Sequence, residues 1–208
     1  MMRMWTLTAA LALAVALSTP AGAYDGLVEK KTFSMPSYTT VNGATIKNVT
    51  VGYESYGSLN AARDNVILVA HFFSGNSHAA GKYAAADPAA GYWDAIIGSG
   101  KPIDTDRFFV ISSDTLVNLN VKDGKTVTTG PASINPDTGK PYGMSFPIVT
   151  IRDFVNVQKA LLDSLGIKKL HAVTIEVGLR RSASSKRSMW RACLRCKYSP
   201  SFSEPANL

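Results

Sequence analysis

Hydrophobic residues in this chain follow two patterns that predict β-strands. Residues 45–53 (TIKNVTVGY) alternate between apolar and polar side chains and are rich in β-branched residues, which is typical of a strand with one buried face. Residues 65–71 (NVILVAH) and 108–112 (FFVIS) are almost continuously apolar, which predicts strands that are covered on both faces. A further run of this kind begins at Leu170 and extends to Val173.

Between the last two expected strands, the spacing of apolar residues becomes helical. They form a stripe along one side of an α-helix and are Ile151, Phe154, Val155, Leu161, Leu162 and Leu165. Thr150 and Asp153 have the spacing of a capping box, with Asp in place of the more common Glu. Gly166 follows, and glycine commonly ends a helix at this position. We therefore predict a helix from Thr150 to Gly166.

Strands that alternate with helices indicate an α/β fold with a mostly parallel sheet, covered on both sides. Two long segments, 72–107 and 114–147, connect the expected elements, and loops of such length are commonly functional. His71 ends a strand and leads into a turn that contains Gly75. α/β hydrolases place one backbone N–H of an oxyanion hole at such a turn. A hydrogen-bonded structural histidine is the alternative interpretation of His71.

The first residues predict an exported protein. Arg3 precedes an apolar run over residues 7–17, Pro20 interrupts the run, and residues 21–23 (AGA) have the small side chains of a signal-peptide cleavage site. A bilayer span needs about 20 apolar residues, so this run is short for a membrane anchor. We predict a signal peptide over residues 1–23 and a mature chain that is periplasmic or secreted, with no membrane association after cleavage.

The charge of the chain is concentrated near its C-terminus. Residues 177–208 contain seven Lys or Arg and one Glu, so they carry +6 of the net charge of +7 and the rest of the chain carries +1. Because the basic character belongs to this segment alone, we do not expect the domain to bind nucleic acid. Cys193 and Cys196 lie in the same segment without the βαβ pattern of a redox site, and we interpret their spacing as chance.

Four segments of the chain carry a family resemblance. They are residues 51–59 (VGYESYGSL), 65–81 (NVILVAHFFSGNSHAAG), 91–110 (GYWDAIIGSGKPIDTDRFFV) and 130–155 (GPASINPDTGKPYGMSFPIVTIRDFV). In these segments the chain resembles homoserine O-acetyltransferase and its relatives in the α/β-hydrolase superfamily, and the last segment is the most specific. The resemblance extends over residues 38–173 and implies the N-terminal half of an α/β-hydrolase fold.

This resemblance implies ping-pong acyl transfer, in which a Ser attacks an acyl donor and the acyl-enzyme then passes the acyl group to an acceptor. The family's His-Ala-Leu-Thr-Gly segment matches residues 71–75, so the resemblance assigns the backbone N–H of Phe73 to the oxyanion hole. Phe72 and Phe73 replace Ala and Leu, which keeps the backbone donor but changes the acyl pocket beside it. The implied partners are a small-molecule acyl donor and acceptor, with acyl-CoA as one co-substrate. We expect no cofactor and no metal, and the resemblance leaves a homodimer open.

The nucleophile that the resemblance calls for is missing. A Gly-x-Ser-Met-Gly-Gly turn should follow residues 170–173, which places its Ser at Val177, but residues 174–181 are TIEVGLRR. Such a strained turn needs small residues, and the bulky side chains at 179–181 do not meet this need. The Asp and His of the family's triad, which follow the Ser, are missing as well.

We therefore divide the chain into a partial α/β-hydrolase domain over residues 24–173 and an anomalous basic tail over 174–208. The tail is expected to be disordered or to arise from a frameshift near codon 174. Acetyl transfer to homoserine is the function that the resemblance favours. An exported esterase is the alternative that the signal peptide favours, because acetyl-CoA is not expected outside the cytoplasm. A non-catalytic remnant is the third, and we expect this chain as written to fold poorly and to be inactive.

Overall fold

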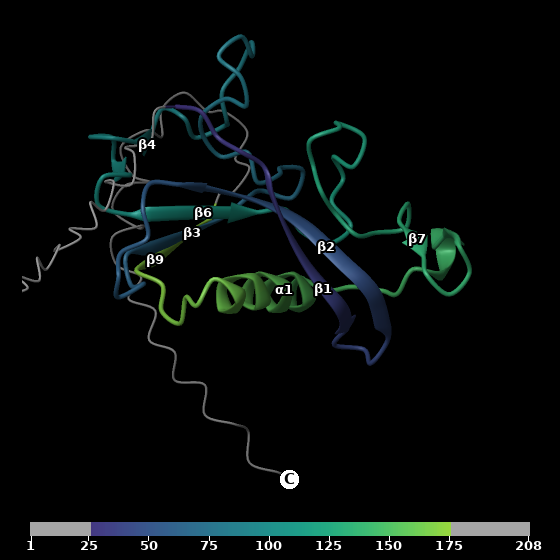
Figure 1. Cartoon of the computed structure of the whole chain (residues 1–208). Coiled ribbons are helices and arrows are strands. Elements are labelled where there is room, and N and C mark those ends of the chain that lie inside the picture. The colour runs from purple at the N-terminus through teal and green to yellow at the C-terminus, as the bar shows by residue number, and fades with distance from the viewer. Residues whose placement is uncertain (1–25, 176–208) are drawn as a thin grey trace, which may run out of the picture.

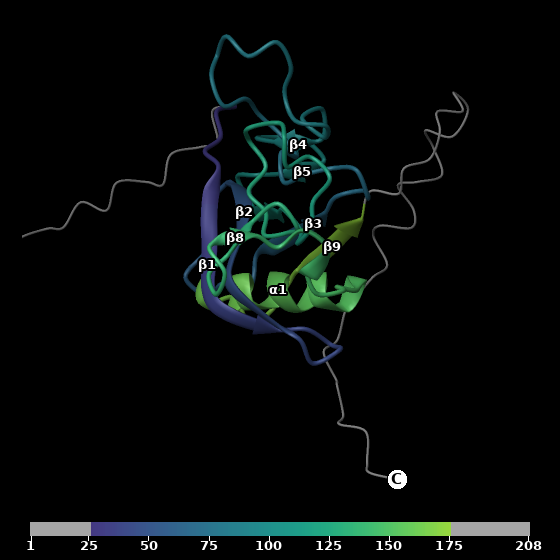
Figure 2. The same ribbon diagram turned by 90° about the vertical axis from the view of Figure 1, so that its right-hand side faces the viewer.

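The computed structural model describes residues 26–175, which form a mixed β-sheet with a long helix against it (Figure 1). Five strands pair in the order β1-β2-β6-β3-β9. They are β1 (Lys31–Thr39), β2 (Thr45–Tyr56), β3 (Val66–Ala70), β6 (Phe109–Ser113) and β9 (Ala172–Ile175). The helix α1 (Ile151–Ser164) crosses one face of this sheet (Figure 2).

The strands of the sheet run in both directions. β3 is parallel to β6 and to β9, whereas β2 is antiparallel to both β1 and β6. The expectation of a mostly parallel sheet is therefore met by β6, β3 and β9 but is wrong for β1 and β2. The short connection between β1 and β2 accounts for this, because only antiparallel neighbours can be joined by a hairpin.

Apolar side chains of β3 enter two separate cores, one on each face of the sheet. Val66 and Leu68 pack toward α1, together with Leu161 and Leu162. The alternate residues Ile67 and Val69 pack on the other face, against parts of the segment 72–107. Their partners there include Ala79, Ala80, Trp93 and Ile97. The prediction that the continuous apolar runs form strands covered on both faces is confirmed for β3 and β6. The third run forms β9 at the edge of the sheet, where Ile175 is 67% exposed.

Helix α1 begins and ends where the sequence predicts. The Thr150 N–H donates to Asp153 Oδ2 at 2.7 Å, which completes the predicted capping box. Gly166 has a φ of +70°, and its N–H donates to the Asp163 carbonyl at 2.9 Å.

The predicted apolar stripe of α1 is only partly correct. Ile151 and Val155 are 77% and 54% exposed, whereas Asp153, Val157 and Leu161 are buried. Asp153, Val157 and Leu161 form a buried row with a spacing of four residues. Leu162 is also buried and lies on the same side of the helix as residues 151 and 155, so the two exposed residues of the stripe are those in its first two turns.

Strand β1 was not predicted from the sequence, because Pro36 interrupts it. The Cα register passes from the pair Met35–Val49 to the pair Ser37–Lys47, so Pro36 has no partner in the ladder. Asn48, the residue skipped on β2, has a φ of +51°. Proline is tolerated here since β1 lies at the edge of the sheet, where a missing N–H costs no ladder hydrogen bond.

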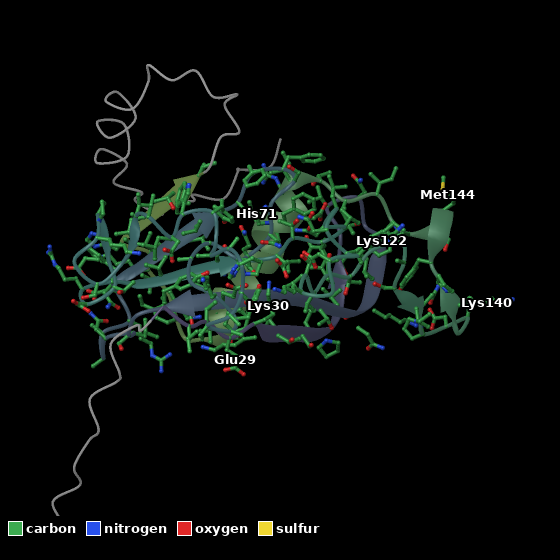
Figure 3. All side chains as sticks on the ribbon, turned by 90° about the horizontal axis from the view of Figure 1, so that it is seen from above. Glu29, Lys30, His71, Lys122, Lys140 and Met144 are labelled. Atoms are coloured by element: carbon green, nitrogen blue, oxygen red, sulfur yellow. The ribbon has the colours of Figure 1, made fainter. Side chains whose placement is uncertain are left out.

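Short elements occur within the two long connecting segments. They are β4 (Ile97–Gly98), β5 (Ile103–Asp104), β7 (Ile134–Asn135), β8 (Lys140–Pro141) and the 3₁₀-helix η1 (Gly143–Ser145). Figure 3 shows Lys140 and Met144 at the tip of an arm that extends away from His71. Within residues 26–175, no helix has the length and apolar character that crossing a membrane requires. The predicted signal peptide lies outside the described residues, and so do residues 176–208 of the predicted tail. The first two residues of that tail, Thr174 and Ile175, belong to β9.

Candidate functional site

Two loops meet at the carboxyl ends of β3 and β6. Residues 71–78, the first loop, follow β3, and residues 114–130, the second loop, follow β6. Because β3 and β6 are parallel neighbours, both loops leave the same edge of the sheet. In open α/β sheets this edge is the usual place of a ligand or active site. The position agrees with the candidate site that the sequence places after His71.

The first loop contains a tight turn whose carbonyl groups are held from several sides. The Phe72 carbonyl accepts the Gly75 N–H at 2.7 Å and lies 2.7 Å from His71 Nδ1. Two side-chain amides of the second loop hold the carbonyls of Ser74 and Gly75. Asn120 Nδ2 donates to the Ser74 carbonyl at 2.9 Å, and Asn118 Nδ2 donates to the Gly75 carbonyl at 3.0 Å.

Phe73, the candidate oxyanion donor, is the second residue of this turn. Its side chain is 85% exposed. Its backbone N–H donates no hydrogen bond to any acceptor within residues 26–175. The turn therefore presents an uncommitted N–H while the carbonyls around it are bound. This is the arrangement of a preorganised donor, although the role of Phe73 itself stays a prediction.

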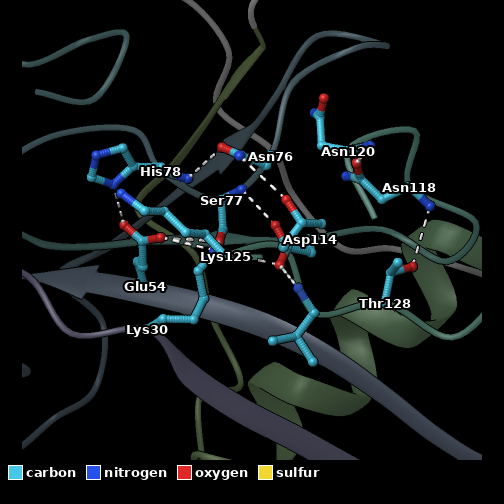
Figure 4. Close-up of polar contacts among 12 residues, drawn as sticks. Lys30, Glu54, Asn76, Ser77, His78, Asp114, Asn118, Asn120, Lys125 and Thr128 are labelled. Atoms are coloured by element: carbon cyan, nitrogen blue, oxygen red, sulfur yellow. Dashed lines mark hydrogen bonds and ion pairs between the residues drawn. The ribbon is translucent and has the colours of Figure 1, made fainter. Parts of the chain in front are cut away.

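A cluster of buried charges anchors the first loop to the sheet (Figure 4). Lys30 Nζ lies 3.0 Å from Glu54 Oε1 and 3.4 Å from Asp114 Oδ2, and both carboxylate side chains have no solvent exposure. The same Nζ lies 2.5 Å from Ser77 Oγ. One lysine of the chain thus connects β2, the start of the second loop and the first loop.

Glu54 is stabilised as a carboxylate despite its burial. Burial alone would raise its pKa, but a hydrogen bond from His78, the Lys30 charge and a hydrogen bond from Tyr83 outweigh burial and keep the pKa below its usual value. The distances from the Glu54 oxygens are 3.0 Å to His78 Nδ1 and 2.7 Å to the Tyr83 hydroxyl. Burial and the Glu54 charge in turn raise the pKa of Tyr83. At neutral pH, Tyr83 is therefore a neutral donor to a charged acceptor.

Asp114 joins the two loops directly. Its Oδ1 accepts the Ser77 N–H of the first loop at 2.7 Å, and its Oδ2 accepts the Val127 N–H of the second loop at 2.9 Å. The carboxylate lies close against the backbone of Gly52 in β2, where a Cβ would collide with Oδ2. Glycine at position 52 therefore makes the room that this bridge needs.

Ser77 does not have the geometry of a nucleophile, even though it contacts a lysine. Its side chain is fully buried, so an ester or thioester cannot reach the oxygen. The Nζ of Lys30 also contacts two carboxylates and is not dedicated to the Ser77 hydroxyl. We interpret Ser77 as an anchor of the first loop.

Several residues of this site were not recognised in the sequence. Lys30, Glu54, Asp114, Asn118 and Asn120 are far apart along the chain, and no motif joins them. Asp114 had the clearest signal, because it directly follows a strand that was correctly predicted as buried.

Other sequence predictions receive no test from this part of the chain. Val177, the expected position of the nucleophile, lies outside the described residues, as do Cys193 and Cys196. No group of three or more His, Cys, Asp or Glu side chains that could hold a metal occurs between residues 26 and 175.

Comparison with known proteins gives relatives of two kinds, homoserine O-acetyltransferases and esterases. No family model matches the chain. It is 49% identical over 147 residues to a homoserine O-acetyltransferase of Carboxydothermus hydrogenoformans, and this match covers 71% of the chain and 37% of the relative. It is 55% identical over 132 residues to a homoserine O-acetyltransferase of Methanosphaerula palustris, with 64% and 26% coverage.

Solved structures of both kinds of relative superimpose on the described fold. Esterase E22 is 69% identical with a TM-score of 0.70, and homoserine O-acetyltransferase from Bacillus anthracis is 51% identical with the same TM-score. Each match covers 72% of this chain and 40% of the solved chain. This chain thus spans less than half the length of the relatives that it matches. By sequence and by fold, it is a homologue of the homoserine O-acetyltransferases, built on the α/β-hydrolase fold that they share with esterase E22.

Proposed function

We propose that residues 26–175 supply the oxyanion-hole part of an exported serine esterase. The uncommitted Phe73 N–H, in a turn whose carbonyls are held on several sides, is the observation that carries this proposal. Ester hydrolysis is preferred over acetyl transfer because the identity to esterase E22 is 69%, against 51% to the Bacillus anthracis acetyltransferase.

The chemistry assigned to the turn is stabilisation of negative charge. When a Ser oxygen attacks an ester carbonyl, the C=O π bond opens and the carbonyl oxygen becomes an oxyanion. The Phe73 N–H would donate to that oxygen, and an N–H next to the nucleophile would be the second donor. The triad His would take the Ser proton during attack and pass it to the alkoxide as the ester C–O bond breaks, so that the alcohol leaves and an acyl-enzyme remains. Water, deprotonated by the same His, would then hydrolyse the acyl-enzyme to a carboxylic acid and the free Ser.

Acetyl transfer from acetyl-CoA to homoserine is the second candidate. The curated relatives at about half identity are homoserine O-acetyltransferases, and this observation favours it. Both reactions share the acyl-enzyme and differ in the acceptor, which is water in one and the homoserine hydroxyl in the other. The turn at Phe73 would serve both, because the developing charge is the same.

Two hybrid proteins test the proposal. Residues 26–175 are joined to the remaining part of esterase E22 in the first hybrid and to the remaining part of the Bacillus anthracis acetyltransferase in the second. Each is assayed for hydrolysis of p-nitrophenyl acetate and for acetyl transfer to homoserine. We expect hydrolysis by the first hybrid and, in the second, a gain of hydrolysis over transfer relative to the parent acetyltransferase. A second hybrid that transfers acetyl groups as its parent does would favour the second candidate.

A matched pair of variants in the first hybrid tests Phe73 itself. Proline suits the second position of a turn and lacks an N–H, so Phe73→Pro removes the donor and keeps the turn. Phe73→Ala removes the side chain and keeps the donor. Loss of one oxyanion donor costs about 10²–10³ in kcat, so we expect a loss of this order for Phe73→Pro only. Equal rates in the two variants would show that the Phe73 N–H has no such role.

A further inference from the structure

His71 contacts the carbonyl oxygen of the residue that follows it. The distance from His71 Nδ1 to the Phe72 carbonyl oxygen is 2.7 Å. A carbonyl oxygen only accepts hydrogen bonds, so Nδ1 must be the donor and must carry a proton. The contact therefore places a proton on Nδ1, and in the neutral ring the lone pair is then on Nε2. That nitrogen is buried, and within residues 26–175 it has no hydrogen-bond partner.

The same contact fixes the direction of the Phe73 N–H. A peptide unit is planar, and in the trans form its N–H points opposite to its C=O. The peptide between Phe72 and Phe73 is trans, since residues 26–175 contain no cis bond. Any group that holds the Phe72 carbonyl therefore also aims the Phe73 N–H, although it does not touch that N–H.

The other anchors of the turn act on different peptide units. Asn118 and Asn120 hold the carbonyls of Gly75 and Ser74. Among residues 26–175, only His71 and the Gly75 N–H hold the Phe72 carbonyl. Loss of the imidazole would leave this peptide with one hydrogen bond, which is the bond that closes the turn itself.

We propose that His71 is a positioning residue for the oxyanion donor: its protonated Nδ1 binds the Phe72 carbonyl and so directs the Phe73 N–H toward the substrate. The inference rests on the proposed function for its catalytic consequence. The tautomer and the orientation of the peptide do not depend on it, and they are measured separately.

Two substitutions separate this role from simple packing. In Asn the amide nitrogen is bonded to Cγ, as Nδ1 is in His, so His71→Asn keeps a donor at the required place. In Gln the amide is one carbon further out and corresponds to Nε2. His171→Ala is the control, because His171 is exposed and directly precedes β9.

Catalysis is measured in the first hybrid. We expect His71→Gln to lower kcat by about 10- to 100-fold, part of the effect of losing an oxyanion donor, with little change in KM. His71→Asn should recover most of that rate, and His171→Ala should match the parent. Equal losses for Asn and Gln, or a loss confined to KM, would overturn the positioning role.

The tautomer is measured in the first hybrid by the ¹⁵N chemical shifts of the His71 ring. We expect a protonated Nδ1 and an unprotonated Nε2, together with a Phe73 amide signal that shifts in His71→Gln and stays near its place in His71→Asn. A proton on Nε2, or an unstructured turn, would refute the inference. An inactive hybrid with a protonated Nδ1 would instead count against the proposed function alone.

Discussion

Replacing Asp114 by Asn tests whether this residue holds the two loops together. The carboxylate accepts the Ser77 N–H on one oxygen and the Val127 N–H on the other, and the side chain has no solvent exposure. An amide of the same size keeps one acceptor oxygen and turns an NH₂ group toward the second N–H. One buried donor then has no acceptor, and Lys30 loses one of its two carboxylate partners.

The size of the effect follows from these contacts. An unsatisfied buried donor costs about 1–3 kcal/mol, and a hydrogen bond to a charged group contributes about 1.5–3 kcal/mol. Because the two losses share one site and the amide can relax, we expect Asp114→Asn to lower the free energy of unfolding by roughly 2–5 kcal/mol. This is a large part of the roughly 5–15 kcal/mol of a typical domain.

Urea denaturation of the first hybrid, followed by tryptophan fluorescence, measures the loss. Asp137→Asn is the matched control, since Asp137 pairs with Lys47 at 2.6 Å and its side chain is 60% exposed; exposed pairs contribute about 0–1 kcal/mol. Hydrogen exchange should show faster exchange at Ser77 and Val127 in Asp114→Asn only. If Asp114→Asn costs no more than Asp137→Asn, or if both amides stay protected, the bridging role is refuted.

Two further predictions concern the helix cap and the chain as a whole. Burial alone would raise the pKa of Asp153, but hydrogen bonds from Tyr38, Thr150 and Val41 outweigh it and hold the pKa at about 2. Since the folded pKa is depressed, this carboxylate stabilises the fold above about pH 4 and the benefit is lost as the pH falls toward 2. Asp153→Asn should therefore cost about 2 kcal/mol at pH 7 in urea denaturation and flatten the acid dependence between about pH 4 and 2; an unchanged acid dependence would contradict this. We also expect the purified 208-residue chain not to hydrolyse p-nitrophenyl acetate; hydrolysis that a serine-directed inhibitor abolishes would contradict this. A one-base correction near codon 174 should open a longer reading frame, which the nucleotide sequence tests.

Local patterns in the sequence were sufficient for the centre of the fold. The runs at β3 and β6 are apolar throughout because both faces of each strand are covered. The capping box at Thr150 and the glycine at position 166 mark the ends of α1, because they satisfy backbone groups within a few residues. Each of these signals depends on neighbours in the sequence, so a short window of residues contains it.

Features that depend on distant partners could not be predicted in this way. Strand β1 contains Pro36, and a proline argues against a strand unless the strand lies at the edge of a sheet. The sequence alone does not show that β1 lies at an edge. Lys30, Glu54 and Asp114 come together only after β1, β2 and β6 have paired. The sequence pattern also predicted that Ile151 and Val155 are buried, because periodicity identifies an apolar stripe but not which of its residues meet the sheet.

The hydrogen bonds between the two loops have a consequence for protein engineering. Side chains of Asn118, Asn120 and Asp114 in the second loop hold the first loop in place. The sequence of one loop alone therefore does not determine its conformation. Grafting residues 71–78 alone into a related scaffold would transfer the amino-acid sequence of the turn without its conformation. A successful graft has to move residues 71–78 and 114–130 as one unit, together with a glycine at the position of Gly52.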